Sequence, residues 1–218
     1  ARQRFYLLDS ERNRLLVFDL NDFSLIRAVR TGYFPLHMAA TRDWNHLMVT
    51  NARSETISLL NLQTLEPDGL AYCPCSSYPR SIAVSNKAIL VTTAVDRGRA
   101  LRTPDNQATV QVVVTEGRVN RMDLGQRVVV EPATLGIFQN NVSPRSLLIA
   151  TPNGTLILIG EDVGLAKMYE ADSDTFVLAR AISDRPLRGG VAATDAGLYN
   201  AGAVMLGSSL VPLTEFRN

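Results

Sequence analysis

The sequence of 218 residues contains only two cysteines and two histidines, and it has no apolar run long enough to cross a membrane. Cys73 and Cys75 are separated by Pro74 alone, so a disulfide between them would be strained. We expect two free thiols, with a redox, intermolecular or metal-binding role as the alternative. His37 and His46 do not form a second ligand pair that would complete a metal site with the cysteines. We therefore expect no membrane span, no metal site and no cofactor.

The sequence also lacks an excess of either charge, because 22 basic residues face 21 acidic ones. Proteins that bind nucleic acids usually carry a clear basic excess, so we expect no nucleic-acid partner. The composition, with 46% hydrophobic and 20% charged residues, is that of a globular protein with a sizeable core.

Recognisable catalytic motifs are scarce as well. Two histidines leave few bases for a His-based triad, and the sequence has no Gly-x-Ser-x-Gly motif. Gly189-Gly190 precedes a predicted strand, so no helix follows it to bind a phosphate. Asp172-Ser173-Asp174 resembles part of a calcium-binding loop but lacks the glycine and the distal glutamate, and we interpret it as a turn. The sequence assigns no catalytic residue.

Short runs rich in Val, Leu and Ile are what the sequence does have, each bounded by Asp, Asn, Ser, Gly or Pro. None keeps a helical period over a dozen positions, so we predict an all-β protein of about eighteen strands. The predicted strands span residues 5–8, 15–19, 24–29, 36–40, 47–50, 56–61, 70–73, 81–84, 88–93, 109–114, 127–130, 146–150, 155–159, 166–170, 176–181, 190–193, 198–201 and 209–213.

These strands repeat. Leu7-Leu8-Asp9 returns as Val49-Thr50-Asn51 and as Val91-Thr92-Thr93, each time about 42 residues later, and a proline starts every fourth strand. A period of four strands predicts a single domain over residues 1–218, a β-propeller of four-stranded antiparallel blades. Insertions near residues 94–108 and 118–141 lengthen one repeat.

The repeat resembles that of YVTN-family β-propeller proteins. Met48-Val49-Thr50-Asn51 is followed by Ser54-Glu55-Thr56-Ile57-Ser58-Leu59-Leu60-Asn61 and then by the proline-led Pro79-Arg80-Ser81-Ile82-Ala83-Val84-Ser85. The resemblance implies relatives that are usually seven-bladed and that are commonly secreted or surface-associated. It therefore implies an exported protein, periplasmic or extracellular. Because the sequence starts at Ala1 without an initiator Met or a leader, we expect a processed form or part of a longer protein.

The strand count predicts about 4.5 to 5 blades, namely three strands, three complete blades, and a last blade that lacks its outermost strand. Such a chain is a partial or open propeller whose apolar blade faces and strand edges are exposed. We expect a protein partner or self-association, with a dimer as one form.

Arginines mark one rim of the predicted propeller. Arg80 and Arg145 are expected at equivalent points where an innermost strand begins, and the insertion after residue 94 is expected to form a loop on the same rim. Several guanidinium groups there could hold an anionic small ligand or an acidic partner surface. The candidate binding residues are His37, Arg80, Arg145, Arg188, Arg97, Arg99 and Arg102. Packing of His37 in the channel, and pairing or solvation of each arginine, are the alternatives.

Two functions follow from this sequence. The first is a non-enzymatic binding or scaffolding propeller that presents the arginine-bearing rim and its blade edges to a partner or an anionic ligand. The alternative is an enzyme similar to propeller hydrolases or lactonases, with part of its site on blades missing from this chain.

Overall fold

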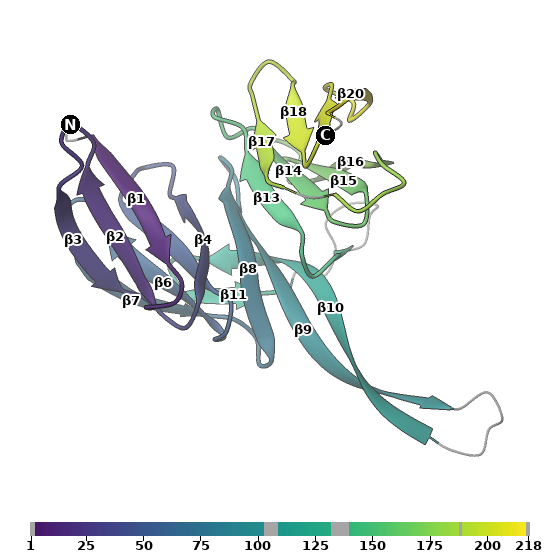
Figure 1. Cartoon of the computed structure of the whole chain (residues 1–218), viewed down its shortest axis with the longest axis horizontal. Helices are drawn as coiled ribbons and strands as arrows, with labels where there is room; N and C mark the ends of the chain where they lie inside the picture. Colours follow the sequence, from purple (N-terminus) through teal and green to yellow (C-terminus); the bar gives the residue numbers. More distant parts are fainter. Residues whose placement is uncertain (1–2, 103–108, 132–139, 188, 217–218) are drawn as a thin grey trace.

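The computed structural model describes residues 3–102, 109–131, 140–187 and 189–216, without the side chains of residues 98–112. The described chain forms twenty β-strands and no helix, so it holds no helix long and apolar enough to cross a membrane. The strands form four hydrogen-bonded sheets, one of which has nine strands and joins two blades through a parallel contact between β7 (Pro67–Tyr72) and β11 (Val128–Val130). Five blades follow one another along an arc, with the N-terminal and C-terminal blades at its two ends (Figure 1). The all-β propeller prediction is confirmed, and the propeller is partial.

The blades are numbered in chain order. Blade 1 holds β1 (Arg4–Asp9), β2 (Arg14–Asp19) and β3 (Leu25–Arg30). Blade 2 holds β4 (Pro35–Ala40), β5 (His46–Asn51), β6 (Thr56–Asn61) and β7 (Pro67–Tyr72). Blade 3 holds β8 (Ser77–Val84), β9 (Ile89–Arg102), β10 (Thr109–Asp123) and β11 (Val128–Val130), and the short β12 (Asn141–Val142) pairs with β10. Blade 4 holds β13 (Leu147–Ala150), β14 (Leu156–Glu161), β15 (Leu165–Glu170) and β16 (Thr175–Ala181). Blade 5 holds β17 (Val191–Ala193), β18 (Tyr199–Ala201), β19 (Val204–Leu206) and β20 (Pro212–Glu215).

Blade 5 differs from the sequence prediction. It has four strands because Val204–Leu206 forms β19, which the prediction omitted, and β20 takes the outermost place that was expected to be empty. A strand of three residues between Gly202 and Gly207 is too short to show an alternating pattern. The prediction that blade 1 has three strands is confirmed.

Apolar side chains between successive blades form the core. Val17 and Val29 of blade 1 pack with Leu47 and Leu60 of blade 2 in one of four buried clusters, and the other clusters join the later blades in the same way. Since an interior blade is covered on both faces, its strands are apolar on both faces, and five of the six residues of β5 are buried.

A buried threonine joins blade 2 to blade 3. Thr50 Oγ1 accepts the backbone N–H of His37 at 3.1 Å and donates to the backbone carbonyl of Arg80 in the next blade at 2.9 Å. The Thr of the repeated Val-Thr pair therefore links two innermost strands, which explains in physical terms why that residue type recurs.

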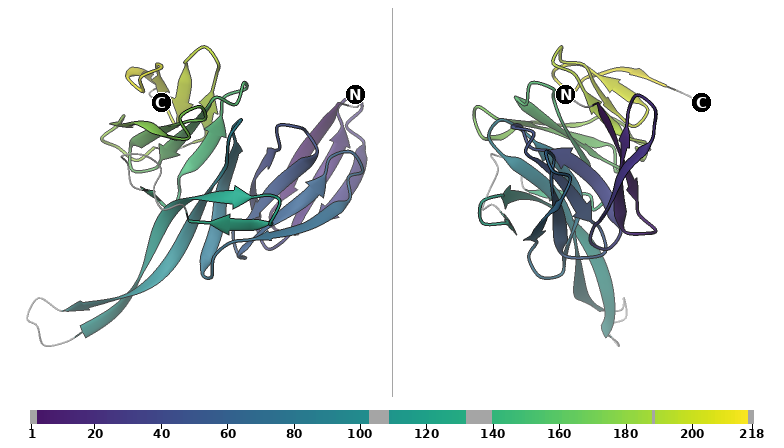
Figure 2. Two further views of the ribbon diagram at one scale, coloured as in Figure 1. Left: turned by 180° about the vertical axis from the view of Figure 1, so that it is seen from behind. Right: turned by 90° about the vertical axis from the view of Figure 1, so that its left-hand side faces the viewer.

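The insertion after residue 94 forms a ribbon rather than a loop. β8 pairs with β9 only as far as Val95, and beyond that point β9 and β10 pair with each other alone, from Asp96 opposite Thr115 to Arg102 opposite Thr109. This two-stranded ribbon projects away from the blades (Figures 1 and 2). The second insertion, residues 118–141, supplies the end of β10, the outermost strand β11 and the start of β12.

The two cysteines are free thiols, as expected. Cys73 is buried and Cys75 is exposed. Burial raises the pKa of the Cys73 thiol to about 12, so this side chain is a packing residue at neutral pH.

Candidate functional site

His37 lies on the innermost strand of blade 2 and contacts the innermost strand of blade 3. Its Nδ1 accepts the backbone N–H of Ile82 at 3.3 Å, and Ser81 Oγ lies 3.4 Å from the same atom. Burial lowers the pKa of His37, so the ring is neutral at pH 7. Because Nδ1 is an acceptor here, the proton of the neutral ring is on Nε2.

Arg80 and Arg145 are not at equivalent points of their blades. Thr92 repeats the hydrogen bonds of Thr50. Its Oγ1 accepts the N–H of Ser81 and donates to the carbonyl of Ser146 at 3.3 Å. The residue equivalent to Arg80 is therefore Ser146, and Arg145 lies one position earlier. Arg80 lies within β8, whereas Arg145 lies in the turn before β13, so the two guanidinium groups are not matched.

The two arginines also differ in their surroundings. Arg80 is half-buried, and its buried Nε has no hydrogen-bond partner within the described residues. Arg145 is exposed and borders a cavity of about 30 Å³ between blades 4 and 5, together with Glu161 and Asp162. Glu161 is buried and forms an ion pair of 3.1 Å with Lys167. Arg145 therefore faces an acidic hollow of about one water molecule in size.

The arginines of the insertion extend away from the channel. Arg97 is exposed at the base of the ribbon, and its Nε lies 3.6 Å from Glu116. The backbone of Arg99 and Arg102 lies further along β9, and their side chains are outside the described set. Seven residues of strand span roughly 23 Å, so Arg102 is distant from the end of β8. Arg188 also lies outside the described residues.

Taken together, the structure places His37 and Arg80 on neighbouring innermost strands and Arg145 just before the innermost strand of the following blade. It separates these residues from the outer part of the ribbon. Their assignment as a binding site stays a prediction.

Another ionic contact joins blades 3 and 4 at the opposite rim. Asp174 accepts hydrogen bonds from Arg121 and from the hydroxyl of buried Tyr169. The guanidinium of Arg121 holds the pKa of Asp174 below its usual value, and burial raises the pKa of Tyr169. Residues 172–174 form the turn that the sequence predicted, and this turn joins β15 to β16.

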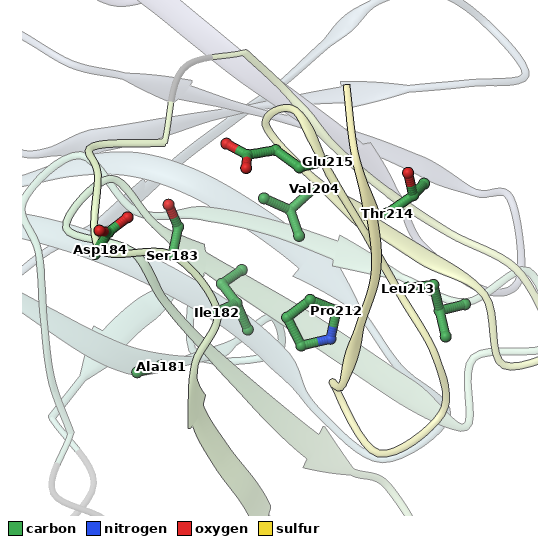
Figure 3. A pocket seen from close by; sticks show the side chains of 9 residues that line it. All are labelled: Ala181, Ile182, Ser183, Asp184, Val204, Pro212, Leu213, Thr214 and Glu215. Carbon is green, nitrogen blue, oxygen red and sulfur yellow. The ribbon is translucent and has the colours of Figure 1, made fainter. Parts of the chain in front are cut away.

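The sequence did not predict a hollow that lies between the outer strands of blades 4 and 5 (Figure 3). It measures about 560 Å³, with Ile182, Val204 and Pro212 around it. The carboxylates of Asp184 and Glu215 approach it from the two blades (Figure 3). Neither forms an ion pair within the described residues. No sequence signal predicts this hollow, because β20 was expected in the third place of the blade rather than the fourth.

These observations define the class of the protein, a partial β-propeller of five blades. The polar and ionisable side chains described above mainly join one blade to the next. Within residues 3–102, 109–131, 140–187 and 189–216, no three His, Cys, Asp or Glu side chains are grouped so as to hold a metal ion.

Comparisons with known proteins add a likeness in structure. No known protein family matches the sequence, and no curated protein matches it. A chain of Kuenenia stuttgartiensis hydrazine synthase is similar in structure, with a TM-score of 0.49 and 14% sequence identity, over 95% of this chain and 81% of that chain.

Proposed function

We propose that this protein is a non-enzymatic binding or scaffolding propeller that associates through its open blade face and its arginine-bearing rim. The partner is a second protein, with another copy of this chain as the first candidate, and the rim arginines hold an anionic ligand or an acidic surface. The uncovered face of blade 1 is the observation that carries the proposal.

Blade 1 carries apolar side chains on both faces, although only one face is covered, and one row of the uncovered face is charged, with Asp9, Arg14 and Arg30. Tyr6, Leu8, Leu15 and Val17 face blade 2. The opposite face holds two cross-strand rows of apolar side chains: Phe5, Phe18 and Leu25, and Leu7, Leu16 and Ala28. In a sheet with one face in water, the side chains on that face are normally polar. The two apolar rows are therefore typical of a face that packs on another blade.

The exposure of this face is substantial. Phe5 is 44% exposed, Leu7 45% and Leu25 55%, and the ring centroids of Phe5 and Phe18 lie 6.2 Å apart. In addition, β1 pairs only with β2 among the described strands, so one of its edges retains backbone donors and acceptors. Both features favour association with another β-rich surface.

Arg80 supports the rim part of the proposal. Arg80 is half-buried and forms no ion pair within the described residues, so its charge can attract an oxyanion. Arg97 is exposed where the ribbon leaves the sheet, and Arg145 is exposed in the turn before β13.

The YVTN-type assignment and an exported location, periplasmic or extracellular, are further parts of the proposal. The resemblance depends on the Val-Thr pairs. The hydrogen bonds of Thr50 and Thr92 to the next blade support it. The location is supported by the resemblance alone, and fractionation of the source cells with an antibody against the protein tests it.

Sedimentation velocity tests the association. We expect a species of twice 23.9 kDa that dissociates in the Leu7→Glu variant, because a charge on the apolar face opposes its burial. Val163→Glu is the matched control, since Val163 is exposed in a turn of blade 4. A monomer up to about 200 μM would contradict self-association.

The rim is tested separately. We expect the double variant Arg80→Gln and Arg145→Gln to bind a polyglutamate peptide at least tenfold more weakly than the parent, because each charged hydrogen bond contributes about 1.5 kcal/mol. Equal binding by the two proteins contradicts the rim proposal and leaves the association test unaffected.

A further inference from the structure

A groove of about 430 Å³ crosses the innermost strands of three consecutive blades. Its walls come from β4, β8 and β13, which are edge strands of their sheets. The fourteen lining residues include six small aliphatic ones, namely Ala39, Ala40, Ala83, Val84, Ile149 and Ala150. This volume and apolar lining are typical of sites that take a small organic molecule.

One end of the groove carries a positive charge. Arg42 extends from blade 2 and donates to the carbonyl of Pro152 in blade 4 at 2.9 Å. It forms no ion pair within the described residues. The neighbouring Asp43 is directed elsewhere, since its carboxylate accepts hydrogen bonds from Thr41 and Asn45. The charge of Arg42 is therefore available to a ligand.

A second hollow of about 400 Å³ adjoins the first, and Arg42 and Lys87 line it. Lys87 likewise forms no ion pair in the part of the chain that the structure describes. Arg121 also lines this hollow, but its charge is compensated by Asp174. Arg42 thus supplies the positive charge at this end of the groove, whereas Lys87 lies in the adjoining hollow, where Asp43 also lines the wall and Lys87 acts on the carboxylate of Asp174.

The opposite end of the groove offers a neutral donor. His37 lines the groove, and its Nδ1 accepts the N–H of Ile82. The ring proton is therefore on Nε2, which makes no hydrogen bond within the described residues. An apolar groove with a cation at one end and a neutral donor at the other is matched to a molecule with an anionic head and an apolar body.

We propose that the groove is a binding site for amphiphilic organic anions, such as medium-chain carboxylates. The carboxylate lies at Arg42, and the hydrocarbon chain lies along the alanines of β4, β8 and β13. The groove involves neither Leu7 nor Arg80, and it shares only His37 with the candidate binding residues of the rim.

The chain contains a natural probe for this site. Trp44 is the only tryptophan, it lines the groove, and it is 66% exposed. A chain that covers its ring removes water from it, so the emission should shift to shorter wavelength. The experiment is a titration of Trp44 fluorescence with decanoate and, separately, with decylamine, both below their critical micelle concentrations.

The variants Arg42→Gln and Arg185→Gln form a matched pair, because both arginines are exposed and only Arg42 lines the groove. We expect saturable binding of decanoate, at least tenfold weaker binding of decylamine, and at least tenfold weaker decanoate binding by Arg42→Gln. Arg185→Gln should bind decanoate within about twofold of the parent.

Three results would overturn the proposal. They are the absence of a saturable change with decanoate, equal affinity for the amine, and an Arg42→Gln variant that binds as well as Arg185→Gln. Far-UV circular dichroism confirms that each variant is folded, so that weak binding reports on the groove.

Discussion

Replacing Thr50 by Val isolates the hydrogen bonds that join blades 2 and 3. Valine has nearly the shape of threonine and favours strands, so packing and β-propensity change little. What the variant removes is the hydroxyl, which accepts the N–H of His37 and donates to the carbonyl of Arg80. Thr50 is fully buried, so water does not replace either bond.

The expected loss follows from these two bonds. A buried hydrogen bond contributes about 1 kcal/mol net, and an unsatisfied buried group costs about 1–3 kcal/mol. We therefore expect Thr50→Val to lower the free energy of unfolding by about 2 kcal/mol. For a protein of this size, that corresponds to a fall in Tm of about 4–8 °C.

Thermal unfolding followed by circular dichroism measures this effect. Thr214→Val is the control, because Thr214 is exposed on β20 and its replacement should change the free energy by less than about 0.5 kcal/mol. Thr92→Val should act in the same direction with a smaller effect, since its bond to Ser146 is longer, at 3.3 Å. A Thr50→Val protein as stable as the control would refute the idea that these threonines hold the blades together.

Further predictions concern titratable groups. Burial lowers the pKa of His37, so below pH 6.5 the unfolded chain binds a proton that the folded chain does not. The urea midpoint of unfolding should therefore fall as the pH drops from 6.5, and it should fall less in the His37→Asn variant. Asp174→Ala should destabilise the protein by about 2–3 kcal/mol, against about 1 kcal/mol for Tyr169→Phe, because the aspartate accepts two hydrogen bonds; urea denaturation compares the two. A thiol-reactive dye should label Cys75 and not Cys73 in the native protein, and both in urea; rapid labelling of two thiols in the native state would contradict this.

The repeat itself was readable from residue types. Leu8-Asp9, Thr50-Asn51 and Thr92-Thr93 end the second strands of successive predicted blades, and their spacing predicts the four-stranded unit. This succeeds because a short apolar run bounded by turn residues is a local property of the sequence. It fails for β19, since three residues do not complete an alternation.

The arrangement of the candidate site could be predicted less well from the sequence. The prolines before Arg80 and Arg145 suggest equivalence, but β8 carries a register shift between Pro79 and Ser81, so the offset is visible only from the hydrogen bonds of the threonines. Likewise, the groove depends on Arg42 of blade 2 reaching Pro152 of blade 4, residues far apart in the chain.

The sequence by itself determined the all-β class and the blade repeat, because each depends on residue type at short and regular spacing. The tertiary structure decided the direction of the ribbon, the register of the arginines and the convergence of three innermost strands on one groove. Those features depend on how strands pair and how blades pack, and a shift of one residue in pairing moves a side chain to the opposite face.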